Sequence, residues 1–259
     1  MKKYNYTRFI TLQLFTVTAV LVLTGCNGQE NSQSINEVTP EFNSIFNGSD
    51  LANWDGDSRF WSVEDGVIVG ETSKDNATER NTFLIWEGEE PSDFELRFRY
   101  KFVEVGDELS GNSGIQVRSE RFVNEEEPQL QHRVRGYQPD FSVTEGVTGN
   151  LYDEAGGLGR IVSPPGQRIL LDSEGNRHVV ETVDDGVEWE KKINHTNWND
   201  FHVYAKGDTI RTYVNDFMAH ELVDHRPEEA RHDGVLAFQL HTGPPMRVEI
   251  KDIELKKLK

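Results

Sequence analysis

Polar side chains stand two residues apart in three segments of the sequence that have the composition of β-strands. These pairs are Gln116 and Arg118, Gln138 and Asp140, and Gln239 and His241. Because side chains on a strand alternate between its two faces, the members of each pair share a face and their apolar neighbours share the other. Amides and a guanidinium bind hydroxyl groups, and an imidazole moves protons near neutral pH. The spacing therefore predicts a polar, sugar-binding surface, with a merely solvated sheet face as the alternative.

The rest of the chain has the pattern of many short antiparallel strands. Residues 94–102 alternate apolar and charged side chains, as a half-buried strand does, and residues 61–69 surround an Asp-Gly hairpin signal. Further turns are predicted at 174–176, 185–186, 206–208 and 214–216, and a final strand at 247–255. Many short strands separated by turns predict an all-β sandwich or jelly roll.

Composition limits both the number of domains and the class of partner. A chain of 259 residues with 36% hydrophobic residues can form one all-β domain with a full core. The formal net charge of −18 argues against nucleic acid as a partner, because phosphate binding requires a basic stripe that the sequence lacks.

The N-terminus has the features of a targeting segment. Lys2, Lys3 and Arg8 precede an apolar run over residues 9–23, which has signal-peptide length and is short for a membrane span. The run ends in Leu-Thr-Gly followed by Cys26, which resembles the lipobox of bacterial lipoproteins. That resemblance implies a lipid on Cys26 and anchoring in the bacterial cell envelope, on its periplasmic or outer-membrane face. A plain secretory signal is the alternative.

The targeting segment divides the chain into three parts. Residues 1–25 are the predicted lipoprotein signal peptide, and residues 26–41 are a polar stretch that predicts a flexible tether. Residues 42–259 are the predicted folded domain. Cys26 is the only cysteine, so the domain contains no intramolecular disulfide.

Several motifs, taken in order, carry a family resemblance that covers residues 42–258. They are Phe-Asn-Gly-Ser-Asp-Leu at 46–51, Asn-Ser-Gly-Ile-Gln-Val-Arg at 112–118, Gly-Tyr-Gln-Pro-Asp at 136–140, Gly-Asn-Leu-Tyr-Asp-Glu at 149–154, Trp-Asn-Asp at 198–200 and Gln-Leu-His at 239–241. Together they resemble the 3-keto-disaccharide hydrolase family. The resemblance implies a concanavalin A-like jelly-roll β-sandwich of two antiparallel sheets with a concave glycan-binding face.

The resemblance also implies a particular chemistry. A ketone at C3 of a sugar acidifies the C2 proton, so a base can remove that proton and the group on C1 can leave by elimination. Addition of water then gives net hydrolysis without the oxocarbenium ion of ordinary glycosidases. Such a site needs a base near C2, a group that stabilises the enolate and an acid for the leaving oxygen.

Roles follow for the residues that match the motifs. His241 is the expected base, with Asp140 as a rival base or as the residue that orients it. Arg118 is expected to stabilise the enolate oxygen, and Glu154 to donate a proton. The expected substrate-binding residues are Gln116, Gln138, Gln239, Tyr137 and Tyr152. Each role has a structural alternative: a hydrogen bond within the sheet for His241, a salt bridge for Arg118 and a turn for residues 152–154.

A divalent metal ion is an open alternative for enolate stabilisation. His241 with Asp140 or a nearby glutamate could supply ligands, and a Lewis acid on the ketone would act as required. The sequence contains no compact metal-ligand motif, so it leaves the metal undetermined. Two positions near the motifs, His132 and Arg160, receive no role from the pattern.

The sequence bears on two other functional classes. Ordinary two-carboxylate hydrolysis on this fold would use Glu-x-Asp-x-x-Glu, and residues 249–254 lack that spacing. A non-catalytic carbohydrate-binding lipoprotein remains the competing hypothesis. The favoured function is a surface-anchored enzyme acting on 3-keto-glycosides, with a neighbouring glycoside oxidoreductase as the partner that supplies them.

Overall fold

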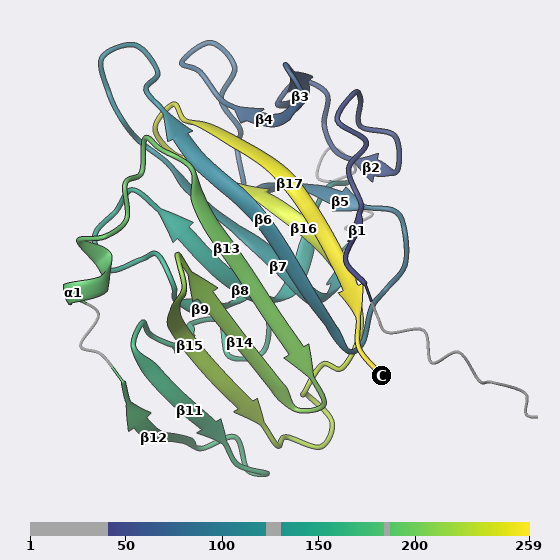
Figure 1. Cartoon of the computed structure of the whole chain (residues 1–259), viewed down its shortest axis with the longest axis vertical. Coiled ribbons are helices and arrows are strands. Elements are labelled where there is room, and N and C mark those ends of the chain that lie inside the picture. The colour runs from purple at the N-terminus through teal and green to yellow at the C-terminus, as the bar shows by residue number, and fades with distance from the viewer. Residues whose placement is uncertain (1–40, 123–130, 184–186) are drawn as a thin grey trace, which may run out of the picture. The chain divides into compact units, whose positions relative to one another are not determined.

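The computed structural model describes residues 41–122, 131–183 and 187–259, which form two β-sheets packed face to face (Figure 1). Within these ranges the only helix is the single turn α1 (Val187–Glu190). The predicted all-β sandwich is therefore confirmed. Among the described residues, no helix has the length and apolar character needed to cross a bilayer. Three segments lie outside the described residues: residues 1–40, which include Cys26, the run of glutamates at 125–127, and the predicted turn at 185–186.

The two sheets contain all the named strands. In spatial order the larger sheet contains β12 (Arg177–Thr182), β11 (Gln167–Leu171), β15 (Phe217–Asp224), β14 (Thr209–Val214), β13 (Asn199–Lys206), β6 (Phe94–Val103), β17 (Arg247–Lys257), β4 (Val67–Glu71) and β3 (Trp61–Glu64), with β1 (Asn43–Ser44) beside β17. The smaller sheet contains β10 (Ile161–Ser163), β9 (Leu151–Glu154), β8 (Val134–Ser142), β7 (Asn112–Arg121), β16 (Val235–Leu240), β5 (Thr82–Trp86) and β2 (Trp54–Asp55).

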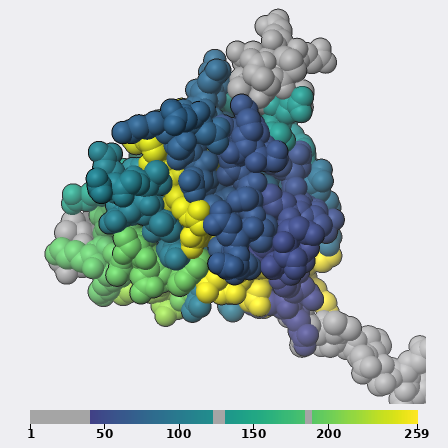
Figure 2. All heavy atoms as spheres, turned by 90° about the horizontal axis from the view of Figure 1, so that it is seen from above, coloured from purple at the N-terminus to yellow at the C-terminus, as the bar shows by residue number. Residues whose placement is uncertain are grey.

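One strand pair departs from the predicted antiparallel arrangement. β11 runs parallel to β15, and all the other pairs of named strands are antiparallel. Parallel neighbours need a long connection between them, and here β12, α1, β13 and β14 intervene in the chain. The C-terminal strand β17 joins segments from the first half of the described chain, and the space-filling view shows its yellow atoms against blue ones (Figure 2).

The core between the sheets follows from strict alternation on β6. Over residues 94–102 its five apolar side chains are buried and its four charged side chains face outward, as the sequence predicts. Phe98 contacts Phe201 on the neighbouring strand, with ring centroids 5.0 Å apart. It also meets Phe141 and Phe238 of the smaller sheet, at 5.8 and 5.0 Å. Each such aromatic pair adds about 0.5–1.5 kcal/mol beyond the burial of its area.

The predicted hairpins form as their turn residues require. Asp65 and Gly66 between β3 and β4 have φ of 46° and 80°, and Asn215 and Asp216 between β14 and β15 have φ of 48° and 68°. Two consecutive residues with positive φ are the signature of the type I′ turn, whose twist matches that of the strands. These turns fix the register of the strands that carry the outward-facing side chains of the larger sheet.

A bend in the β7–β8 hairpin shapes the outer face of the smaller sheet. The register between β7 and β8 shifts between Val117 and Glu120, and Arg118 has a left-handed φ of 48°. Beyond this bulge the hairpin reaches the far edge of the sheet, where Arg121 pairs with Asp55 at 2.6 Å. The hairpin covers a second apolar cluster, on the face turned away from the main core: Phe83, Ile85, Val134, Val235 and Ala237.

The bend depends on a glycine opposite the bulge. Gly136 has a φ of 143°, and a Cβ there would lie 2.5 Å from Oγ and 3.0 Å from Cα of Ser119. Only glycine adopts this backbone region without strain, because the strain of any other residue in this conformation is about 1–3 kcal/mol. Gly136 therefore lets β8 lie against the bulge of β7.

We predict that Gly136→Ala lowers the free energy of unfolding by more than about 2 kcal/mol, through strain and contact with Ser119. Gly146→Ala is the matched control, because Gly146 also has a positive φ, of 76°, but a Cβ there would meet nothing within 4 Å. Urea unfolding measures both variants. Equal losses would show that the contact at Ser119 has no energetic role.

Candidate functional site

Four polar side chains meet on the outer face of the smaller sheet, as the sequence predicts. Gly114 on β7 pairs with Asp140 on β8, and the register of β16 places Gln239 on the other side of Gly114. One step along the strands, Gln116 and Gln138 are neighbours. The four residues Gln116, Gln138, Asp140 and Gln239 are each at most 7% exposed. The Gln138 side chain occupies the space that a side chain at Gly114 would need, because a Cβ there would lie 2.6 Å from Gln138 Cγ. The polar groups thus form a buried floor rather than a solvated face.

A directed chain of hydrogen bonds connects most of this floor. Ser119 Oγ donates to Gln116 Oε1 at 2.6 Å, and Gln116 Nε2 donates to Gln138 Oε1 at 2.7 Å. Gln138 Nε2 then donates to Asp140 Oδ1 at 2.8 Å. Oδ1 of Asp140 accepts the bond from Gln138 whether or not the other carboxyl oxygen carries a proton, so each amide turns its nitrogen toward Asp140. The chain holds one oxygen of Asp140 in a fixed position.

Burial shifts the proton equilibria of two carboxyl groups on this face. Loss of water raises the pKa of Asp140 well above its ordinary value, the hydrogen bond from Gln138 opposes this, and the charge of Glu154 adds to it. Burial also raises the pKa of Glu154, against the hydrogen bond from Asn81 and the charge of His241. A carboxyl group with a raised pKa stays protonated at a pH closer to neutral, so it is suited to general acid catalysis.

Gln239 leaves its whole side-chain amide without a partner. The residue is 1% exposed, and neither its Nε2 nor its Oε1 has a hydrogen-bond partner in the described chain. Asn112 Oδ1 on the neighbouring strand is in the same condition. An unpartnered buried polar group costs about 1–3 kcal/mol, a cost that a ligand with matching donors and acceptors would remove. The amide of Gln239 offers both a donor and an acceptor at the floor.

The rim of the site is formed by groups with partial exposure. Tyr152 and Glu154 project from β9 on the same face as Gln138, and His241 follows the end of β16. The His241 Nδ1 lies within hydrogen-bond distance of the Thr242 carbonyl oxygen. A neutral ring that donates from Nδ1 leaves Nε2 to accept a proton. His241 also borders a hollow of about 270 Å³ together with Asn112.

Asn81 links the two sides of this rim, and sequence reasoning missed it. Its Oδ1 accepts from the Thr242 amide at 3.1 Å, and its Nδ2 donates to Glu154 Oε1 at 3.3 Å. Asn81 lies in a loop without periodic pattern, 73 positions from Glu154 in the chain, so no local signal indicates the contact. The link holds the segment after His241 beside Glu154.

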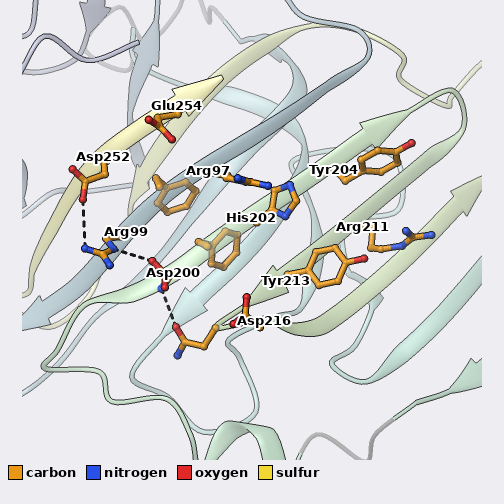
Figure 3. Close-up of a pocket in the computed structure, with 13 residues that line it drawn as sticks. Arg97, Arg99, Asp200, His202, Tyr204, Arg211, Tyr213, Asp216, Asp252 and Glu254 are labelled. Carbon is orange, nitrogen blue, oxygen red and sulfur yellow. Dashed lines mark hydrogen bonds and ion pairs between the residues drawn. The ribbon is translucent and has the colours of Figure 1, made fainter. Parts of the chain in front are cut away.

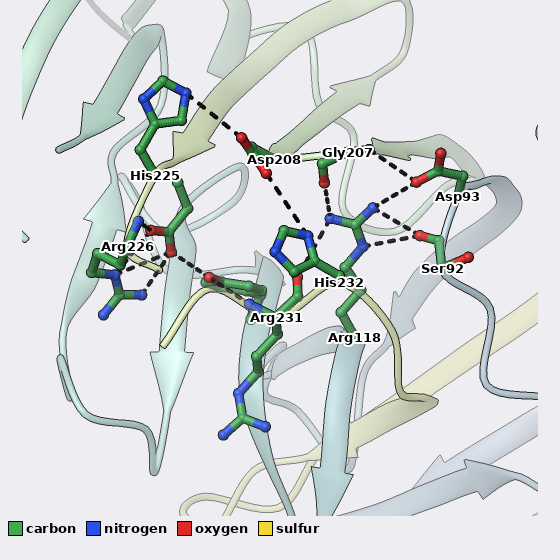
Figure 4. A network of polar contacts seen from close by, with 11 residues as sticks. Ser92, Asp93, Arg118, Gly207, Asp208, His225, Arg226, Arg231 and His232 are labelled. Atoms are coloured by element: carbon green, nitrogen blue, oxygen red, sulfur yellow. Dashed lines mark hydrogen bonds and ion pairs between the residues drawn. The ribbon is translucent and has the colours of Figure 1, made fainter. Parts of the chain in front are cut away.

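Arg118 does not belong to this site, and the expectation that it shares a face with Gln116 is wrong. The left-handed φ at the bulge turns its side chain toward one end of the sandwich, where it is 1% exposed. There its guanidinium donates to the carbonyl oxygens of Ser92 at 2.8 Å and Gly207 at 2.6 Å, and it pairs with Asp93 at 3.2 Å (Figure 4). With a longer bond to the carbonyl oxygen of Arg231 at 3.4 Å, Arg118 joins three loops and is not available to an enolate.

Tyr137 is also misplaced by the sequence-based prediction. It occupies an odd position on β8, beside Pro139 and Phe141, and it points into the core between the sheets. Its hydroxyl donates to Asp224, which Arg226 pairs with at 2.7 Å, and burial raises the pKa of the tyrosine. Tyr137 therefore supports the core and does not contribute to the rim.

The remaining residues near the motifs have structural contacts. Asp153 accepts from the amides of Leu158 and Gly159, so the turn-capping alternative holds for Asp153 and not for its two neighbours. His132 pairs with Asp55 at 3.1 Å at the end of the bent hairpin. Among the residues that the structure describes, no three His, Cys, Asp or Glu side chains group closely enough to hold a metal ion.

Comparison with known proteins agrees with this architecture. The family model of the 3-keto-alpha-glucoside-1,2-lyase-like domain matches residues 41–256, which confirms the resemblance drawn from the motifs. No curated protein matches the chain.

Solved structures share the fold at low sequence identity. A protein of Parabacteroides distasonis, provisionally described as a glycosyl hydrolase, is 14% identical over 84% of this chain and 100% of its own, with a TM-score of 0.50. A second from that organism is 18% identical over 84% of this chain and 94% of its own, with a TM-score of 0.49. The carbohydrate-binding module CBM66 of Bacillus subtilis is 10% identical over 80% and 96%, with a TM-score of 0.47.

We predict that Arg118→Gln lowers the free energy of unfolding by about 1–3 kcal/mol, because the carbonyl groups of Ser92 and Gly207 lose a charged donor. Arg59→Gln is the control, since the Arg59 side chain is 66% exposed where it pairs with Asp57, and its loss should change the free energy of unfolding little. Urea unfolding distinguishes the two. A loss for Arg118→Gln no larger than for the control would contradict its structural role.

Proposed function

Because the chain belongs to the 3-keto-alpha-glucoside-1,2-lyase-like family, we propose that it is an enzyme that cleaves 3-keto-glycosides on the outer face of its smaller sheet. The single observation that supports this most is the unpartnered amide of Gln239 on the same buried floor as Asp140. A free donor and a carboxyl group that retains its proton are the groups that a developing enolate oxygen requires. A surface that only binds glycans would use the free amide but has no need of a protonated carboxyl group.

The first step is removal of the C2 proton. His241 Nε2 takes the proton, because the Thr242 carbonyl holds the other ring nitrogen as the donor. The electron pair of the C–H bond forms the C2–C3 double bond, and negative charge moves to the ketone oxygen. The Gln239 amide and the protonated Asp140 donate hydrogen bonds to that oxygen. In this scheme they take the part that the sequence assigned to Arg118.

The second step breaks the bond from C1 to the leaving oxygen. Electrons return from the enolate to form the C1–C2 double bond and restore the ketone, while Glu154 donates a proton to the departing oxygen. Burial favours the protonated form of Glu154, so the acid is present closer to neutral pH. Water then adds to the enone, with its hydroxyl at C1 and a proton at C2, which gives net hydrolysis.

The remaining expectations complete the proposal. Tyr152 and Asn112 would contact the sugar at the rim, next to the hollow that borders His241. A lipid on Cys26 would place the enzyme at the bacterial cell envelope, near a glycoside oxidoreductase that makes its substrate. The proposal leaves the requirement for a divalent ion open, and comparing activity with and without a chelator tests it.

We predict that the purified full chain releases glucose from 3-keto-trehalose and nitrophenol from 4-nitrophenyl 3-keto-glucoside, followed with and without EDTA. His241→Asn should lower kcat/KM for both substrates by about 10²–10⁴, the usual contribution of a general base. Glu154→Gln should lower it strongly for 3-keto-trehalose and little for the nitrophenyl glycoside, because nitrophenolate departs without a proton.

The control is His178→Asn, which changes an exposed histidine on β12 of the other sheet and should leave both rates unchanged. Failure of the unchanged chain to cleave either substrate, with retained binding of the same sugars, would leave the non-catalytic carbohydrate-binding protein as the function. Equal effects of Glu154→Gln on both substrates would remove Glu154 as the acid.

A further inference from the structure

The larger sheet has a hollow of its own on its outer face (Figure 3). The proposed cleavage site is on the other sheet of the sandwich. The hollow has a volume of about 640 Å³ and lies over β6, β13, β14 and β17. We propose that it is a second binding surface, which holds a neutral glycan chain without cleaving it. This inference concerns binding alone, so it does not rest on the proposed reaction.

Two bulges give this face its shape. On β17 the register with β6 shifts between Lys251 and Glu254, where Asp252 has a left-handed φ of 53°. On β14 the register with β15 shifts at Thr212 and Tyr213. Bulges bend a strand, increase its twist and re-aim its side chains, and they recur beside binding sites. Here they flank the hollow and bring side chains from both strands to its lining.

Three aromatic rings stand together in the hollow. His202 and Tyr213 are paired across β13 and β14, and their rings stack 5.5 Å apart at an interplanar angle of 19°. Tyr204 lies two residues along β13 on the same face, and all three residues are partly exposed. Burial lowers the pKa of His202, so its ring is neutral at neutral pH. Half-exposed rings beside polar groups suit a pyranose, which presents C–H groups on its faces and hydroxyls at its edge.

The charges of the lining select an uncharged ligand. Three guanidinium groups face four carboxylates, in a chain whose formal net charge is −18. They are Arg97, Arg99, Arg211, Asp200, Asp216, Asp252 and Glu254. Arg99 pairs with Asp200 at 2.9 Å and with Asp252 at 3.7 Å, so charge is neutralised locally while many donors and acceptors remain. An anionic polysaccharide needs an excess of positive charge, which this lining does not offer.

The size and position of the hollow fit a chain of sugars. Its volume lies in the range of about 300–1,000 Å³ that ligand sites occupy, and the face is open rather than enclosed. A polymer held on the larger sheet would keep the protein at its glycan while the smaller sheet acts on released fragments. The surface would then supply avidity without a second catalytic group.

Affinity gel electrophoresis of the full chain with dextran, laminarin and barley β-glucan tests the proposal. We predict retardation by at least one of these neutral glucans, and at least tenfold weaker binding for the double variant Tyr204→Ala and Tyr213→Ala. Asp252→Asn keeps the left-handed backbone that asparagine tolerates and removes one acceptor, so it should weaken binding severalfold. Phe217→Ala, a partly exposed aromatic residue outside the hollow, is the control and should bind unchanged.

Release of nitrophenol separates the two surfaces. The double tyrosine variant should retain the rate of the unchanged chain on the nitrophenyl 3-keto-glucoside, and His241→Asn should retain the glucan retardation. The proposal is overturned if no glucan retards the unchanged chain, if the tyrosine and Asp252 variants bind as well as it does, or if His241→Asn abolishes the retardation.

Discussion

The bulge at Arg118 is the constraint on which both the stability and the chemistry of this protein depend. One residue with left-handed φ turns the arginine into the loops at one end of the sandwich, and it bends the β7–β8 hairpin over the outer face of the smaller sheet. Gln116, Gln138 and Gln239 are buried on this face.

Burial of this polar floor sets its protonation. Asp140 loses water and gains only one hydrogen bond from the amide chain, so its pKa rises despite that donor. A carboxyl group whose pKa is higher in the folded than in the unfolded state stabilises the fold below the unfolded value of 3.8, and this contribution is lost as pH rises through the folded pKa. In the proposed mechanism, this loss of stability at neutral pH accompanies a proton donor at the floor, as in sites that tune acids by burial.

The alternation of strand side chains was enough to place much of this floor from sequence. Gln138, Asp140 and Gln239 lie where period two puts them, because β8 and β16 are regular at those positions. The same rule applied to Tyr137 indicates the core, and the tyrosine does lie there. The rim position was inferred from the family motif, which predicted the orientation of Tyr137 less well than alternation does. Arg118 could not be predicted, because left-handed φ is favoured by Gly and Asn and nothing in the sequence marks an arginine for it. Asn81 reaches Glu154 through tertiary structure alone, which local pattern does not contain.

The protonation of Asp140 in the folded protein tests this account most directly. Carbon-13 NMR of the side-chain carboxyl groups across a pH titration, with the Asp140 resonance assigned by its absence from Asp140→Asn, measures the value. Burial of Asp140 predicts a midpoint well above the value of about 3.9 that an exposed aspartate shows. A midpoint at or below that value would mean that water reaches the carboxylate, and the buried polar floor would not exist.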